Sequence, residues 1–147
     1  MSDFSDTCDV FLDDLSTVVR GAKLHRYAPW DPERFLNDGD THLAVWPAGE
    51  AETSEAFTTR GKLIRQTYVV AYWEPGDDED ERQVVDEVAA RELLDLHNAI
   101  RERFFDLSLQ ESNTQVNYTG STFAEATRPV RGFLMSVTVE RGKDLIG

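Results

Sequence analysis

The sequence predicts an α+β domain of two layers, with a mostly antiparallel four-stranded sheet and two helices packed on one of its faces. Two segments carry apolar residues at helical spacing, and four segments read as strands. Their order is helix, strand, strand, helix, strand, strand. This order is typical of helices that cover one face of an antiparallel sheet. The chain of 147 residues suits a single domain spanning 1–147.

The first helix is predicted over residues 4–20, where apolar side chains form one stripe and Gly21 provides a stop. Cys8, the only cysteine, falls on this stripe, so we expect a buried and inert thiol. Residues 22–40 contain two prolines and an Asn-Asp-Gly run, and are expected to be irregular.

A strand is predicted over residues 41–46, and a long polar segment, 48–61, follows it. This segment exceeds the length of an ordinary hairpin loop. We interpret it as an arm that reaches a neighbouring subunit, with Phe57 as its anchor. The next strand, 62–73, is wholly apolar towards its end, so both of its faces are expected to be covered there. A second subunit is one source of that cover.

A long helix is predicted over residues 83–106, and strands over 114–119 and 130–140. Residues 141–147 are expected to form a short tail. Leu94 and Phe105 lie off the core stripe of the long helix. They are either tolerated surface residues or contacts with a partner. The candidate subunit-interface residues are Phe57, Tyr68, Val70, Tyr72, Trp73, Leu94 and Phe105.

Recognisable catalytic or metal-binding patterns are absent from the sequence. It contains no glycine-rich phosphate loop and no serine elbow. His25, His42 and His97 lack metal spacing, and each is interpreted as a surface residue of a loop, strand or helix. We therefore expect no enzyme activity, metal or cofactor, and a small enzyme with an unrecognised carboxylate site is the alternative. No basic leader or membrane-length apolar run is present, so no membrane partner is expected.

The net charge of −13 disfavours binding to nucleic acid, since such binding requires cations that displace counterions from phosphates. Only three lysines occur, which favours either a salt-loving source or the arginine bias of a GC-rich genome. An acidic run precedes the long helix. Its carboxylates either form a solvated loop that favours the helix N-terminus or line a surface past which DNA moves without sticking. The candidate channel-lining residues are Asp77, Asp78, Glu79, Asp80 and Glu81.

The size and the order of elements resemble those of tail terminator proteins of viruses with long, siphophage-type tails. The resemblance rests on the long segment 48–61, the acidic run before the long helix and the final strands 114–119 and 130–140. It implies a virion protein, assembled in the host cytoplasm, that forms a homohexameric ring. Such a ring caps the tail tube, joins it to the neck or head completion protein and lets the genome DNA pass. A lysine-poor surface would suit a virus of a halophilic host.

Three other functions are compatible with the sequence. A head completion or stopper protein of the neck, or a tail tube subunit, belongs to the same structural class. An acidic protein that mimics DNA, or a regulatory binding protein, belongs to another class and would compete for a basic partner.

Overall fold

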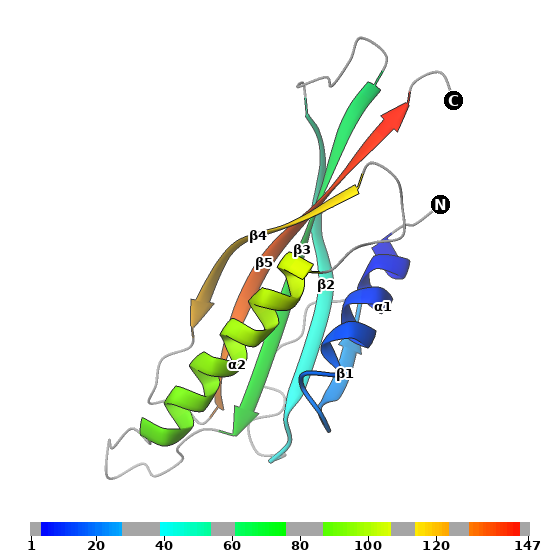
Figure 1. The fold of residues 1–147 in the computed structure, drawn as a ribbon. Coiled ribbons are helices and arrows are strands. Elements are labelled where there is room, and N and C mark those ends of the chain that lie inside the picture. The colour runs from blue at the N-terminus through cyan, green and yellow to red at the C-terminus, as the bar shows by residue number, and fades with distance from the viewer. Residues whose placement is uncertain are drawn as a thin grey trace.

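The computed structural model describes residues 4–27, 39–53, 61–75, 87–106, 114–123 and 130–144. These residues form a five-stranded mixed sheet with two helices (Figure 1). The predicted α+β class is confirmed, and a two-layer arrangement is compatible with it. The predicted number of four strands is wrong, because a fifth strand forms within the segment expected to be irregular.

The described elements follow one another as α1 (Phe4–Leu15), β1 (Lys23–Arg26), β2 (His42–Thr53), β3 (Gly61–Pro75), α2 (Glu87–Asp106), β4 (Thr114–Phe123) and β5 (Val130–Asp144). The strands lie side by side in the order β1-β2-β3-β5-β4. β1 pairs with β2 in parallel, and the other three pairings are antiparallel. β1 and β4 are therefore the two edges of the sheet.

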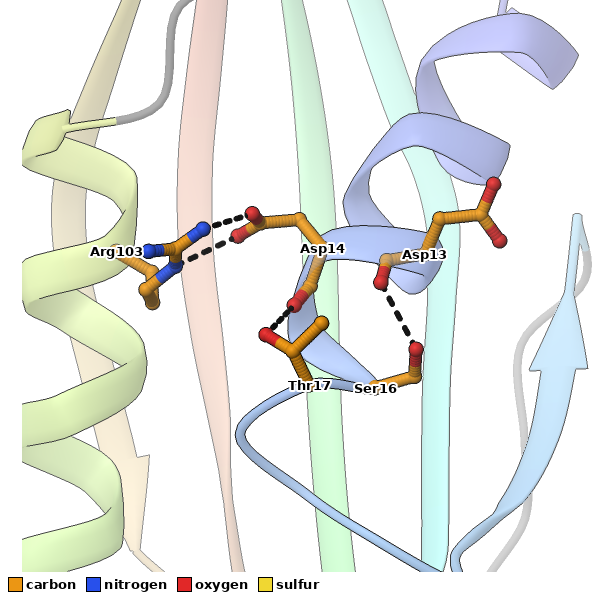
Figure 2. Close-up of polar contacts among 5 residues, drawn as sticks. All are labelled: Asp13, Asp14, Ser16, Thr17 and Arg103. Carbon is orange, nitrogen blue, oxygen red and sulfur yellow. Dashed lines mark hydrogen bonds and ion pairs between the residues drawn. The ribbon is translucent and has the colours of Figure 1, made fainter.

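The first helix ends earlier than predicted, at Leu15 instead of residue 20. The reason is local: the hydroxyl of Ser16 donates to the carbonyl of Asp13 at 2.8 Å, and the hydroxyl of Thr17 donates to the carbonyl of Asp14 at 2.7 Å (Figure 2). Such hydroxyls satisfy the last helical carbonyls and compete with the backbone for them. The chain can then turn towards β1.

One core fills the space between the helices and the sheet, so both helices cover the same face. The sheet contributes alternate residues of β2, β3, β4 and β5, as a half-covered sheet should. The fully buried side chains include Phe11, Leu12, Leu15, Leu43, Val45, Tyr68, Val70, Ile100, Phe133 and Val137. Phe11 joins the layers, since its ring lies 5.4 Å from that of Tyr68 and 5.1 Å from that of Phe104.

Part of the predicted loop over 48–61 is strand, because β2 runs to Thr53 and β3 begins at Gly61; residues 54–60 lie outside the described residues. Similarly, β5 continues to Asp144, so the predicted tail is strand over 141–144. In Figure 1 these ends of β2, β3 and β5 project past both helices. The sequence signal was weak because neither described helix covers most of this part of the sheet (Figure 1), which therefore shows little apolar alternation.

A polar network ties this projecting part of the sheet to α1. The guanidinium of Arg141 donates to the side-chain carbonyl of Gln66 and, at 2.8 Å, to the hydroxyl of Thr7. The hydroxyl of Tyr68 donates to Gln66 at 2.9 Å, and the amide of Gln66 donates to Glu50 at 3.0 Å. Because Thr7 and Gln66 are buried, these bonds offset the cost of removing polar groups from water.

Candidate functional site

The structure separates the residues predicted to form a subunit interface. Tyr68, Val70 and Tyr72 face the helices and are at most 6% exposed, so the core of a single chain accounts for their burial. Leu94 and Phe105 are 50% and 59% exposed on α2. Phe57 and the proposed channel-lining residues Asp77, Asp78, Glu79, Asp80 and Glu81 lie outside the described residues.

Trp73 belongs to the other face of the sheet and explains why β3 loses its alternation. Its side chain is 9% exposed and packs with Ala44, Ala71 and Trp46 in a second, smaller cluster. Across the strand pair, Trp73 lies opposite Gly132 on β5. A Cβ at Gly132 would lie 2.8 Å from the Trp73 ring, so only glycine allows the indole to approach here. The apolar end of β3 thus packs largely within the chain.

Exposed apolar side chains gather at the β4 edge of the domain, which we call the β4 surface. Leu94 and Phe105 share one side of α2, because eleven residues are about three helical turns. Phe123 ends β4 and is 42% exposed. Tyr118 of β4 joins the two elements, since its ring lies 6.4 Å from that of Phe105 and 6.0 Å from the guanidinium carbon of Arg101. The β4 surface is defined by Leu94, Arg101, Phe105, Tyr118 and Phe123.

The strand beneath this surface carries no charge. β4 reads Thr-Gln-Val-Asn-Tyr-Thr-Gly-Ser-Thr-Phe, without a charged residue or a proline, in a chain of which 29% is charged. Natural edge strands are usually protected against pairing by lysine, other charges, proline or a bulge. Of these devices β4 has only a bulge, between Tyr118 and Gly120.

A buried histidine fixes α2 against β4. His97 is 5% exposed, and its Nε2 lies 2.7 Å from the hydroxyl of Ser121, which in turn lies 2.8 Å from the hydroxyl of Tyr118. Its Nδ1 lies 3.1 Å from the side-chain oxygen of Asn98. One consistent set of donors runs from the Tyr118 hydroxyl to Ser121, from Ser121 to His97 Nε2, and from His97 Nδ1 to Asn98. These bonds hold the β4 surface in one arrangement.

The interpretation of the histidines as surface residues is wrong for two of them. His97 lies between α2 and β4, while His42 is 2% exposed in β2. His42 Nδ1 lies 3.0 Å from Nε2 of His25, which is half-buried in β1. His97 falls near the core stripe of α2, at helical spacing from Leu93 and Ile100, and that signal could have placed it inside.

A second, different surface lies at the opposite edge, and we call it the β1 surface. Leu24 of β1 and Tyr27, just after the strand, are 39% and 48% exposed. Tyr27 has a φ of 71°, which is uncommon for a residue other than glycine. Its hydroxyl donates to the carboxylate of Asp9 at 2.8 Å, and Arg26 pairs with the same carboxylate at 3.5 Å. The hydrogen bond to the Asp9 carboxylate raises the pKa of the Tyr27 hydroxyl.

An ion pair joins the helices that carry the two surfaces. Arg103 of α2 uses two guanidinium nitrogens to hold both carboxylate oxygens of Asp14 in α1, with Nε at 3.1 Å from Oδ2 (Figure 2). Such a two-bond contact fixes geometry as well as adding energy. The ion pair therefore fixes the position of the β1 surface, beside α1, relative to the β4 surface, beside α2.

The chemistry of both surfaces suits contact with another protein. Each combines exposed apolar side chains with a strand edge that no other described strand covers, which are features of a protein interface; β4 is uncharged, whereas β1 carries Lys23 and Arg26. Among the described residues, no three side chains of the kinds that ligate metals come together. Neither described helix is long and apolar enough to cross a membrane. No protein-family model matches this chain, and no curated protein matches it.

Proposed function

We propose that this chain is a structural subunit that assembles head to tail into a ring, and that the ring is a tail terminator of a virus with a long, siphophage-type tail. The observation that supports the ring is the pair of unlike surfaces on opposite edges of one sheet. Contacts between two different surfaces of identical subunits continue from copy to copy and close into a ring when the rotation allows it. A two-fold dimer would instead use one surface twice.

The charge distribution supports the same proposal. Copies with a net charge of −13 repel one another, so contacts are most favourable where the surface is neutral or cationic. The β4 surface meets that requirement, since β4 is uncharged and Arg101 lies beside it. In a ring, the remaining carboxylates would face solvent, the tail tube protein, the neck protein and the passing DNA. A polyanionic lining would let DNA pass without binding it.

The salt-loving source and the virion location belong to this proposal. Acidic, lysine-poor surfaces suit high salt, where repulsion among carboxylates is screened.

A neck stopper protein or a tail tube subunit would also close a ring. Assembly on purified tail tubes separates these roles, because a terminator binds the finished end of a tube and a tube subunit copolymerises with the tube protein.

The mass of the purified chain in high and low salt tests the proposal, by mass photometry or analytical ultracentrifugation. We expect a closed oligomer, a hexamer on the terminator proposal. Leu94→Glu and Phe105→Glu should each convert it to monomers, because a buried carboxylate without a partner is costly. Val88→Glu is the matched control: Val88 is 69% exposed on the same helix but about 120° around it from Leu94. A wild-type chain that stays monomeric at micromolar concentration would exclude the ring.

A second candidate is a DNA mimic that binds a basic protein, which the net charge of −13 and the outward carboxylates of α1 favour. Exposed side chains such as Asp6 and Asp13 would then provide the contacts. Replacing them with Asn would weaken capture of a basic DNA-binding protein, and it would leave ring assembly through the β1 and β4 surfaces intact.

A further inference from the structure

The two edges of the sheet differ in how they are protected against pairing. β4 offers ten residues without charge or proline. β2, where it extends past β1, carries Pro47, Glu50 and Glu52, which are protective residues for an edge. β1 carries the cations Lys23 and Arg26, and charges of this kind protect an edge against pairing with an edge of the same charge. The edge best suited to meet β1 is therefore the uncharged β4.

The hydrogen bonds of β1 show which of its backbone groups point outwards. The amide of Lys23 donates to the carbonyl of Thr41, just before β2, at 2.8 Å, and the amide of Tyr27 donates to the carbonyl of Val45 in β2 at 3.1 Å. Because backbone groups alternate along a strand, the amides and carbonyls of Leu24 and Arg26 point away from β2. The outer edge of β1 thus offers two residues to an additional strand.

We propose that β4 of one copy pairs through its backbone with β1 of the next copy, so that one sheet continues across each contact in the ring. This inference rests on the proposed ring and names the contact that closes it. Addition of a strand to an open edge is an established mode of protein recognition, in which main-chain hydrogen bonds supply affinity and side chains supply specificity.

The side chains beside the two edges are compatible with this pairing. In a continued sheet, α2 of one copy and α1 of the next lie on the same face. Arg101, on the outward side of α2, would then approach Asp9, on the outward side of α1. Leu94 and Phe105 would meet Leu24 and Tyr27, so the exposed apolar groups of both edges become buried in one contact.

A two-fold contact between two β4 strands fits less well. It would bring Arg101 of each copy to the same contact and leave Leu24 and Tyr27 uncovered. It would also stop at a dimer, since the strand is used by both copies. The head-to-tail contact uses both edges of every copy.

Disulfide cross-linking tests the pairing in the full chain. In a Cys8→Ala background, Lys23→Cys is combined in turn with Gln115→Cys, Asn117→Cys and Thr122→Cys. Lys23 lies opposite His42, on the face of the sheet away from the helices. The three β4 positions point to the same face, because they alternate with residues that pack towards α2. Adjacent strands bring paired Cβ atoms to about 4.5–5.5 Å, within reach of a disulfide. We expect at least one combination to give a ladder of covalent oligomers on mild oxidation, and Lys23→Cys alone to give none. Lys23→Cys with Glu92→Cys is the control, because Glu92 is exposed on α2 away from the strip formed by Leu94 and Phe105.

Hydrogen exchange distinguishes strand pairing from simple proximity. The backbone amides of β4 that point away from β5 should exchange at least tenfold more slowly in the assembled protein than in the Phe105→Glu monomer. A ring that shows neither the cross-links nor the slowed exchange would overturn the strand pairing and leave the proposed ring standing. Cross-links between copies that carry only one β4 cysteine would overturn it in favour of a two-fold contact. A wild-type chain without any oligomer would reject both proposals.

Discussion

Gly132 is the position at which the packing of the sheet is most sharply testable. A Cβ at this residue would lie 1.9 Å from the carbonyl oxygen of Tyr72 and 2.8 Å from Cε3 of Trp73. Real Cβ contacts essentially never fall below 3.0 Å, so the Tyr72 carbonyl would have to move by about 1.1 Å. β3 cannot shift easily, because its backbone is paired with β2 on one side and β5 on the other.

We therefore expect Gly132→Ala to destabilise the protein at the upper end of the usual range for overpacking, about 3 kcal/mol. For a domain of this size, that corresponds to a fall in Tm of roughly 6–12 °C. Urea unfolding would measure the change as a lower midpoint at an unchanged m value. The fluorescence of the native state should also change, since the Trp73 ring must leave its place above the sheet.

Gly49→Ala provides the matched control. Gly49 also lies in a strand, but a Cβ there would meet no atom within 4 Å. Its effect should stay within about 0.5 kcal/mol, as for most surface substitutions. If Gly132→Ala fell within about 1 kcal/mol of the wild type, the close packing of β5 under Trp73 would be refuted.

Three further outcomes are expected from the same structure. Ser121→Ala should lower the free energy of unfolding by about 1–3 kcal/mol, because it removes the hydroxyl bonded to a buried histidine. Tyr118→Phe should lower it by less. Equal losses for the two variants in urea unfolding would contradict the donor order from Tyr118 through Ser121 to His97. A double-mutant cycle on Arg103→Ala and Asp14→Ala should give a coupling of about 0.5–1 kcal/mol that falls in 1 M salt, and a salt-independent coupling would contradict an exposed pair. Burial raises the pKa of the Cys8 thiol from 9.0 to about 11, so the folded state holds this proton more tightly than the unfolded state. Its contribution to stability is full below pH 9.0 and is lost as the pH rises towards 11, so Cys8→Ala should flatten the alkaline fall of the unfolding free energy.

Much of the fold could be predicted from local patterns in the sequence. The first strand of the final pair was found through its alternation at Val116 and Tyr118, and α2 through its apolar stripe. Cys8 was expected to be buried, and it is fully buried in the core. These predictions succeeded because burial against a neighbouring layer forces the period of the apolar residues to match the period of the backbone.

The elements that escaped prediction depend on distant partners. β1 has four residues with a single apolar side chain, and it becomes a strand only because β2 lies beside it in parallel. The early end of α1 follows from hydroxyls that compete for carbonyls, a balance that the apolar stripe does not report. The extension of β2 to Thr53 follows from pairing with β3, since its own residues are small and polar.

The sequence by itself determined the class of the fold and the acidity of the chain. It also determined the absence of a recognisable catalytic pattern and the exposure of Leu94 and Phe105. Only the tertiary structure decided that Tyr68 and Val70 face a core within the chain, and that β4 and β1 are the edges. The physical reason is that edges depend on strand order, which is set by pairing between segments far apart in the chain. An uncharged strand such as β4 is unremarkable as a sequence and becomes a candidate interface only once the structure shows that no other described strand pairs with its outer side.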